Sequence, residues 1–102
     1  MEKRAFRRYP VNINVKFYCC SSVYSGTVKN LSENGMYIDT TEMHFPSDSR
    51  LEIVFATDEL KFHVPVKFVR LTTSPDYQDG FAVEISNPPR EYYKLLNNVI
   101  SS

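Results

Sequence analysis

The sequence predicts a mainly β fold of one domain that ends in an α-helix. Six segments are typical of strands, and the first, fifth and sixth of them alternate apolar and polar residues with the period of two of a strand with one buried face. Short polar segments separate these strands, and apolar residues at helical spacing follow the sixth. Six short strands in about 80 residues are typical of a barrel or a sandwich. A chain of 102 residues can bury such a core without a metal or a disulfide.

The first three predicted strands cover residues 11–18, 23–31 and 35–40. The first alternates strictly, and its buried face is formed by Val11, Ile13, Val15 and Phe17. Polar residues 32–34 connect the second strand to the third, so we expect these two strands to form a hairpin.

The other three predicted strands cover residues 50–57, 60–71 and 80–86, with a polar loop at 72–78. Proline has no N–H to donate to a ladder, so Pro65 predicts that the fifth strand lies at an edge or carries a bulge there. Large aromatic residues fall on the core-facing parity of these strands and of the first strand: Phe17, Phe55, Phe62, Phe68 and Phe81.

The end of the sequence predicts an α-helix over about residues 88–100. Asn87 is suited to the N-cap, and Pro88 to the first helical position. Apolar side chains then recur at helical spacing, at Tyr92, Leu95, Leu96, Val99 and Ile100. We expect this apolar stripe to plug or cover one end of the barrel.

Positive charge is concentrated at the start of the chain. Residues 1–10 carry a net charge of +3, and because the formal charge of the whole chain is zero, the remainder carries −3. A general nucleic-acid binder spreads positive charge over a whole face, so this distribution favours a small anionic partner over DNA or RNA. We interpret residues 1–10 as a flexible basic segment and residues 11–102 as the barrel with its helix. A merely solvated tail is the alternative.

Residues suited to catalysis or metal binding are sparse. His44 and His63 have no ligand-like spacing, and Cys19 and Cys20 are adjacent, so neither pair predicts a metal site. No nucleophile–base pair is evident, so we expect no enzyme, no catalytic residue and no cofactor. The start of the sequence lacks the layout of a secretory signal, and no apolar run is long enough to span a membrane. These features favour a cytoplasmic protein without membrane insertion.

Two short motifs indicate a binding function. Arg4 and Arg8 form an RxxxR motif before the first strand, and residues 30–35 read Asn-Leu-Ser-Glu-Asn-Gly in the first hairpin. Together they resemble the RxxxR and (D/N)xSxxG motifs of PilZ domains, as do Arg8-Tyr-Pro-Val, Phe68-Val69-Arg70 and the segment 80–85. The resemblance covers about residues 3–100. It implies a six-stranded antiparallel β-barrel of PilZ type with a C-terminal α-helix, and it implies binding of cyclic di-GMP.

The resemblance assigns ligand binding to Arg4, Arg8, Asn30, Ser32 and Gly35, with additional contacts expected from Lys3, Arg7 and Arg70. A guanidinium can donate two parallel bonds to guanine or to a phosphate, and it can also stack on a base. Asn30 and Ser32 would hydrogen-bond a guanine edge or a phosphate, and Gly35 would allow a tight turn or a close approach of the ligand. The alternative is that these three residues only satisfy a local turn, with Gly35 at a positive φ.

We therefore expect a cyclic di-GMP sensor that changes conformation on binding and signals to a separate partner protein. One alternative is an interaction adaptor of the same fold without ligand binding. A less favoured alternative is a barrel that binds single-stranded nucleic acid by stacking on its seven Tyr and seven Phe residues. The core-facing parity of most of the phenylalanines argues against that second alternative.

Overall fold

The computed structural model describes residues 7–19, 22–40, 50–56, 61–74 and 77–101, without the side chains of residue 19 and of residues 70–79. Six strands and one helix follow each other along the chain: β1 (Tyr9–Cys19), β2 (Ser22–Leu31), β3 (Gly35–Asp39), β4 (Arg50–Ala56), β5 (Lys61–Ser74), β6 (Tyr77–Glu84) and α1 (Arg90–Ser101). The predicted mainly β fold with a C-terminal helix is confirmed.

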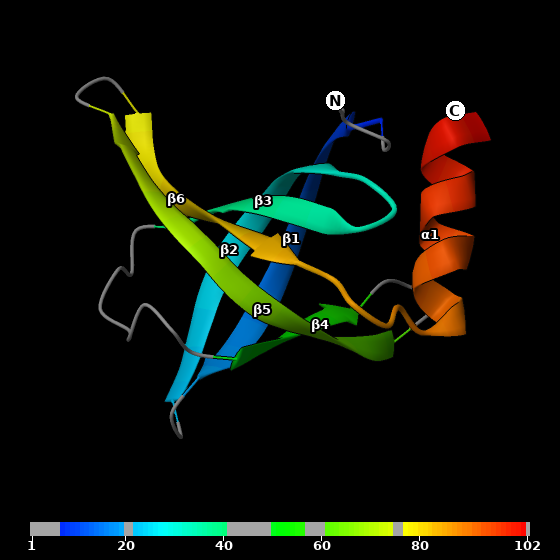
Figure 1. Ribbon diagram of the computed structural model, residues 1–102, viewed down its shortest axis with the longest axis horizontal. Helices are drawn as coiled ribbons and strands as arrows, with labels where there is room; N and C mark the ends of the chain where they lie inside the picture. The colour runs from blue at the N-terminus through cyan, green and yellow to red at the C-terminus, as the bar shows by residue number, and fades with distance from the viewer. Residues whose placement is uncertain (1–6, 20–21, 41–49, 57–60, 75–76, 102) are drawn as a thin grey trace.

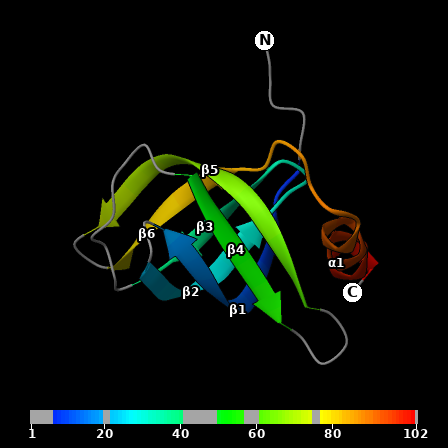
Figure 2. The same cartoon turned by 90° about the horizontal axis from the view of Figure 1, so that it is seen from below.

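The strands close into an antiparallel barrel in the order β1-β2-β3-β6-β5-β4 (Figures 1 and 2). The β1–β4 ladder closes the ring through three residue pairs, from Lys16↔Val54 to Tyr18↔Glu52. A closed barrel satisfies both sides of its strands by hydrogen bonding and excludes the sandwich that the strand count alone allowed. The helix α1 lies beside one end of the barrel (Figure 2).

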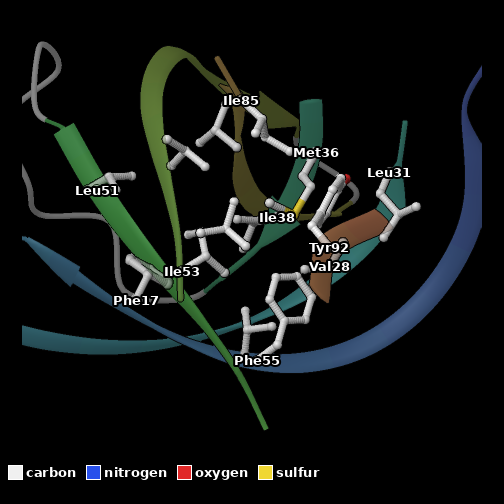
Figure 3. Close-up of a cluster of buried hydrophobic side chains, with 14 of the residues drawn as sticks. Phe17, Val28, Leu31, Met36, Ile38, Leu51, Ile53, Phe55, Ile85 and Tyr92 are labelled. Atoms are coloured by element: carbon white, nitrogen blue, oxygen red, sulfur yellow. The ribbon is translucent and has the colours of Figure 1, made fainter. Parts of the chain in front are cut away.

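The core is formed by the strand parities that the sequence predicts, except that Val11 and Ile13 on β1 are only half-buried and pack against its edge. Phe17 on β1 and the alternating residues Leu51, Ile53 and Phe55 of β4 point into one cluster (Figure 3). Val15 and the alternating apolar residues of β5 and β6 are buried in the same cluster. The five core-facing phenylalanines are all buried, and several pack as ring pairs, such as Phe55 stacked on Phe62 at 5.0 Å between centroids. The aromatic content is therefore explained mainly by packing, which weakens the stacking alternative.

A β-bulge interrupts β2 near the end that leads into the first hairpin. The β2–β3 register shifts between Val28 and Asn30, so Lys29 is an extra residue in the ladder. Val28 and Leu31 are both fully buried, although they are three positions apart and strict alternation would place them on opposite faces. The bulge therefore keeps both side chains in the core and leaves Asn30 on the outer face between them.

Two predicted boundaries in the barrel are wrong. β1 begins at Tyr9, whose pairing with Leu31 makes residues 9 and 10 part of the barrel. The polar loop predicted at 72–78 is mostly strand, because the β5–β6 ladder continues to Ser74↔Tyr77. The apolar alternation stops where the two strands pass beyond the core, whereas backbone pairing between them does not depend on it.

Pro65 is accommodated without a bulge at its own position. β5 has neighbours on both sides, so it is not an edge strand over its whole length. Its ladder with β6 begins only at Lys67, however, so the stretch around Pro65 pairs with β4 alone. One side of the strand is locally unpaired there, and this is a position that tolerates proline.

The helix α1 begins two residues later than predicted, at Arg90. Pro89 disfavours a helical conformation for Pro88, and the Pro89 carbonyl instead accepts a hydrogen bond from the N–H of Tyr92 at 3.0 Å. Tyr92 and Leu96 are buried, as predicted, but Ile100 is 48% exposed. At about 100° per residue, Ile100 lies roughly 80° around the helix from Tyr92, which turns it away from the barrel.

Candidate ligand-binding site

Residues from the two sequence motifs meet on the surface of the barrel. Arg8 precedes β1 and donates a hydrogen bond from Nη1 to Oδ1 of Asn30 on β2, at 2.6 Å. The two residues are 22 positions apart, and the antiparallel β1–β2 ladder brings them together because Pro10 pairs with Asn30. Arg8 is exposed and Asn30 is half-buried. The barrel therefore presents a guanidinium and a carboxamide side by side.

This pair has the donors and acceptors to bind a nucleotide. A guanidinium has five N–H donors, and in the described part of the chain Arg8 uses one hydrogen bond, to Asn30. Donors on the same planar group remain available for a phosphate or for O6 and N7 of guanine. The bulge in β2 is what places Asn30 beside Arg8, because without it the parity of Val28 would carry Asn30 into the core.

The turn that follows Asn30 is held by its own hydrogen bonds. The Ser32 N–H donates to the Gly35 carbonyl at 2.9 Å, and the Ser32 hydroxyl donates to Asn34 Oδ1 at 3.0 Å. The N–H of Ile85, just after β6, donates to the Asn34 carbonyl at 2.8 Å. Ser32 is 1% exposed. The Ser32 side chain thus stabilises the turn locally, which is the alternative role that the sequence analysis considered for it.

A tyrosine of the C-terminal helix contacts this turn from inside. The Tyr92 hydroxyl donates to the Ser32 carbonyl at 2.7 Å, across 60 residues of sequence (Figure 3 shows Tyr92 among the core side chains). Burial raises the pKa of the Tyr92 phenol well above its ordinary value, and the positive charge of Arg8 offsets part of that rise. Helical spacing predicts Tyr92 on the apolar stripe but does not predict this bond, since no spacing pattern relates residues so far apart.

Gly35 opens β3 at a crowded point. An added Cβ there would lie 2.9 Å from the Val83 carbonyl oxygen of β6 and 3.6 Å from Nη2 of Arg8. Its backbone does not have the left-handed conformation that the alternative interpretation required. Glycine is needed because β3 and β6 approach closely under the Arg8 side chain.

The structure describes only some of the other residues that were predicted to contact the ligand. Arg7 is exposed, and its guanidinium lies 5.9 Å from the centre of the Tyr9 ring, a cation–π contact. The β5–β6 register places Arg70 opposite Ala82, but its side chain is not described. Lys3 and Arg4 lie outside the described residues, so their predicted contacts with a ligand remain predictions.

Other surface features of the described residues involve none of the predicted site residues. A cavity of about 510 Å³ lies over β1 to β4, and its lining includes Asn14, Thr27 and Asp39 but none of the predicted site residues. The exposed side chains of His63 and Glu52 are in contact, with 3.3 Å between Nδ1 and Oε2. Within the described ranges, no group of three or more His, Cys, Asp or Glu side chains could hold a metal ion. No helix in those ranges is long and apolar enough to cross a membrane.

The closed barrel, the arginine before β1 and the turn after Asn30 together describe a small β-barrel domain with one candidate site. A model of the PilZ domain family matches residues 2–102, which is nearly the whole chain. The protein belongs to the PilZ domain family, as the two motifs predict. PilZ domains are binding and adaptor domains, and the family binds cyclic di-GMP.

Two solved structures show how widely this fold is shared. The inhibitor of motility MotI/DgrA of Bacillus subtilis superposes with a TM-score of 0.79 at 16% identity, covering 99% of this chain and 51% of that one. The present chain thus spans about half the length of that protein. The PilZ domain of CeSA from a cellulose-synthesizing bacterium superposes with a TM-score of 0.68 at 16% identity, covering 93% and 96% of the two chains. No curated protein matches the sequence.

Proposed function

We propose that this PilZ domain is a sensor of cyclic di-GMP and that Arg8 and Asn30 hold the ligand. The observation that carries the proposal is the 2.6 Å hydrogen bond between these two side chains, one from each motif. The ligand has two phosphates and two guanines, and the guanidinium and carboxamide offer donors and acceptors suited to both groups. Arg4 would bind a second part of the ligand, with Lys3, Arg7 and Arg70 adding positive charge around it.

In this proposal Ser32 and Gly35 act by shaping the site. The hydrogen bonds of Ser32 hold the turn that follows Asn30, and Gly35 lets Arg8 lie close to β3 and β6. Ligand binding would draw the basic segment at residues 1–8 against the outer face of the barrel. The energy for this closure comes from charge-assisted bonds between arginine and phosphate.

The route from the site to a partner protein runs, in this proposal, through the helix α1. The Ser32 carbonyl and the Tyr92 hydroxyl connect the ligand turn to α1 by one buried hydrogen bond. A shift of the turn when ligand binds would therefore change the position or stability of α1, because a buried carbonyl retains its partner. The partner protein would bind the surface altered in this way.

The test is calorimetric titration of the purified protein with cyclic di-GMP, with GTP and a short single-stranded oligonucleotide as controls at the same salt concentration. The wild-type protein should bind cyclic di-GMP saturably and bind neither control. Arg8→Ala should lower the affinity by about 10- to 100-fold, since hydrogen bonds to charged groups contribute about 1.5–3 kcal/mol. Arg50→Ala is the matched control, because it removes an exposed arginine at the start of β4. A folded Arg8→Ala protein with full affinity would contradict the site.

A second candidate function is an adaptor that binds a protein partner without ligand. The outer side of α1 favours it, because Tyr93 and Ile100 are 41% and 48% exposed and lie seven residues apart on one helix. The same titration separates the two functions. Absence of both heat and a shift in melting temperature with cyclic di-GMP would leave the adaptor as the function.

A further inference from the structure

Tyr37 lies on the same outer surface as the Arg8–Asn30 pair. In the β2–β3 ladder it is the direct partner of Asn30, and in the β3–β6 ladder it is the direct partner of Ala82. Its chain neighbours Met36 and Ile38 are fully buried, so Tyr37 has the outward parity of β3. Residues directly opposite each other in antiparallel strands have Cβ atoms about 5 Å apart. A ligand held at Asn30 therefore lies beside the base of the Tyr37 side chain.

The Tyr37 ring rests on the backbone of β6. Gly80 is the diagonal neighbour of Tyr37 across the β3–β6 ladder, and the position of a Cβ at Gly80 would lie 2.7 Å from Cζ of the tyrosine. The absence of a side chain at Gly80 thus provides the space that the phenol end of the ring occupies. The tyrosine is half-buried and does not belong to the hydrophobic core cluster, so part of its surface faces outward.

An aromatic side chain held in this way can bind a base. Stacking on an aromatic ring contributes to the binding of unpaired bases in many nucleic-acid-binding proteins. A ring supported by the sheet loses little conformational freedom when a base stacks on it. Ala82, the direct partner of Tyr37 on β6, has a small side chain and so occupies little of the surface beside the ring.

We propose that Tyr37 is a further ligand-contacting residue, whose ring stacks against one guanine of the cyclic di-GMP held by Arg8 and Asn30. This inference rests on the proposed function and adds a contact that neither sequence motif contains. The arginine and the asparagine supply hydrogen bonds to the phosphate and to the base edge, and the tyrosine supplies a contact to the base face.

The test compares three variants by titration with cyclic di-GMP, after melting curves have shown that each is folded. Tyr37→Leu keeps an apolar side chain but removes the aromatic ring, and should lower the affinity by about 10- to 100-fold. Tyr37→Phe keeps the ring and should keep the wild-type affinity. Tyr18→Leu is the matched control, since Tyr18 is 45% exposed on β1 and pairs with Val23, away from Asn30.

Tyrosine fluorescence provides a second readout that does not depend on the leucine variant folding. The chain has no tryptophan, so its seven tyrosines dominate the emission. A stacked guanine should quench the emission of Tyr37, and most of this quenching should be lost in Tyr37→Phe although that variant still binds.

Each outcome decides between the two proposals. A wild-type protein that does not bind cyclic di-GMP overturns the proposed function and the Tyr37 contact together. Wild-type binding with equal affinity in a folded Tyr37→Leu protein overturns the contact alone. Equal weakening in Tyr37→Leu and Tyr37→Phe would show that the hydroxyl matters and not the ring, and full quenching in Tyr37→Phe would place the base elsewhere. Both of these results also overturn the stacking contact.

Discussion

The hydrogen bond between α1 and the ligand turn can be tested by Tyr92→Phe, which removes one oxygen atom from the core. The Ser32 carbonyl accepts this bond at 2.7 Å, and Ser32 is 1% exposed, so water does not readily replace the phenol. A buried acceptor left without a donor destabilises a protein by about 1–3 kcal/mol. Phenylalanine offsets part of this destabilisation because its ring has no hydroxyl to desolvate. We therefore expect the free energy of unfolding to fall by about 1–2 kcal/mol.

The loss should be measurable in two ways. Urea denaturation followed by circular dichroism gives the free energy of unfolding directly, and a loss of about 1–2 kcal/mol should lower the melting temperature by about 5–15 °C in a domain of this size. Tyr93→Phe is the matched control, since Tyr93 is the next residue of α1 and is 41% exposed. We expect it to change stability by less than about 0.5 kcal/mol. Equal stability of the two variants would refute the account of the Ser32–Tyr92 bond.

The same substitution should alter how stability depends on alkaline pH. Burial raises the pKa of the Tyr92 phenol in the folded protein above its value of about 10 in the unfolded chain. Above about pH 10 the phenol of the unfolded chain releases its proton, whereas the buried phenol of the folded protein keeps it. The stability that Tyr92 contributes is therefore fully present below about pH 10 and declines above that pH by up to about 1.4 kcal/mol per pH unit. Stability curves of Tyr92→Phe and wild type measured from about pH 8 to about pH 11 should therefore converge as pH rises. Parallel curves would contradict the buried environment of the phenol.

Two further predictions concern the site and the barrel surface. Gly35→Ala places a Cβ 2.9 Å from the Val83 carbonyl oxygen, so β3 and β6 must separate slightly. We expect a loss of about 1–3 kcal/mol in urea denaturation, and unchanged stability would show that glycine is not needed for close packing there. His63→Ala removes a contact with Glu52 in which both side chains are about half exposed. Its effect on the free energy of unfolding should stay below about 0.5 kcal/mol, and a larger loss would show a role beyond a surface pair.

Patterns of side-chain periodicity were sufficient to predict the six strands, the helix and most of the core. Val15 and Phe17 are buried as their parity on β1 predicts, and so is Tyr92 on the apolar stripe of α1. The sequence predicted strand ends less well. It ended β5 before Ser74 because the apolar alternation stops there, while the backbone ladder with β6 continues. Periodicity reports contact with a core, and backbone pairing can extend beyond that core.

Within the candidate site, the sequence by itself identified residue types, and the tertiary structure decided how they are combined. Arg8 and Asn30 could be singled out as members of two motifs, but their contact depends on the β1–β2 register and on the bulge at Lys29. The bond from Tyr92 to Ser32 and the contact of the Tyr37 ring with Gly80 likewise join segments that are distant in the chain. Such contacts follow from barrel closure and strand register, which are set by the packing of all six strands together and not by any local spacing of residues.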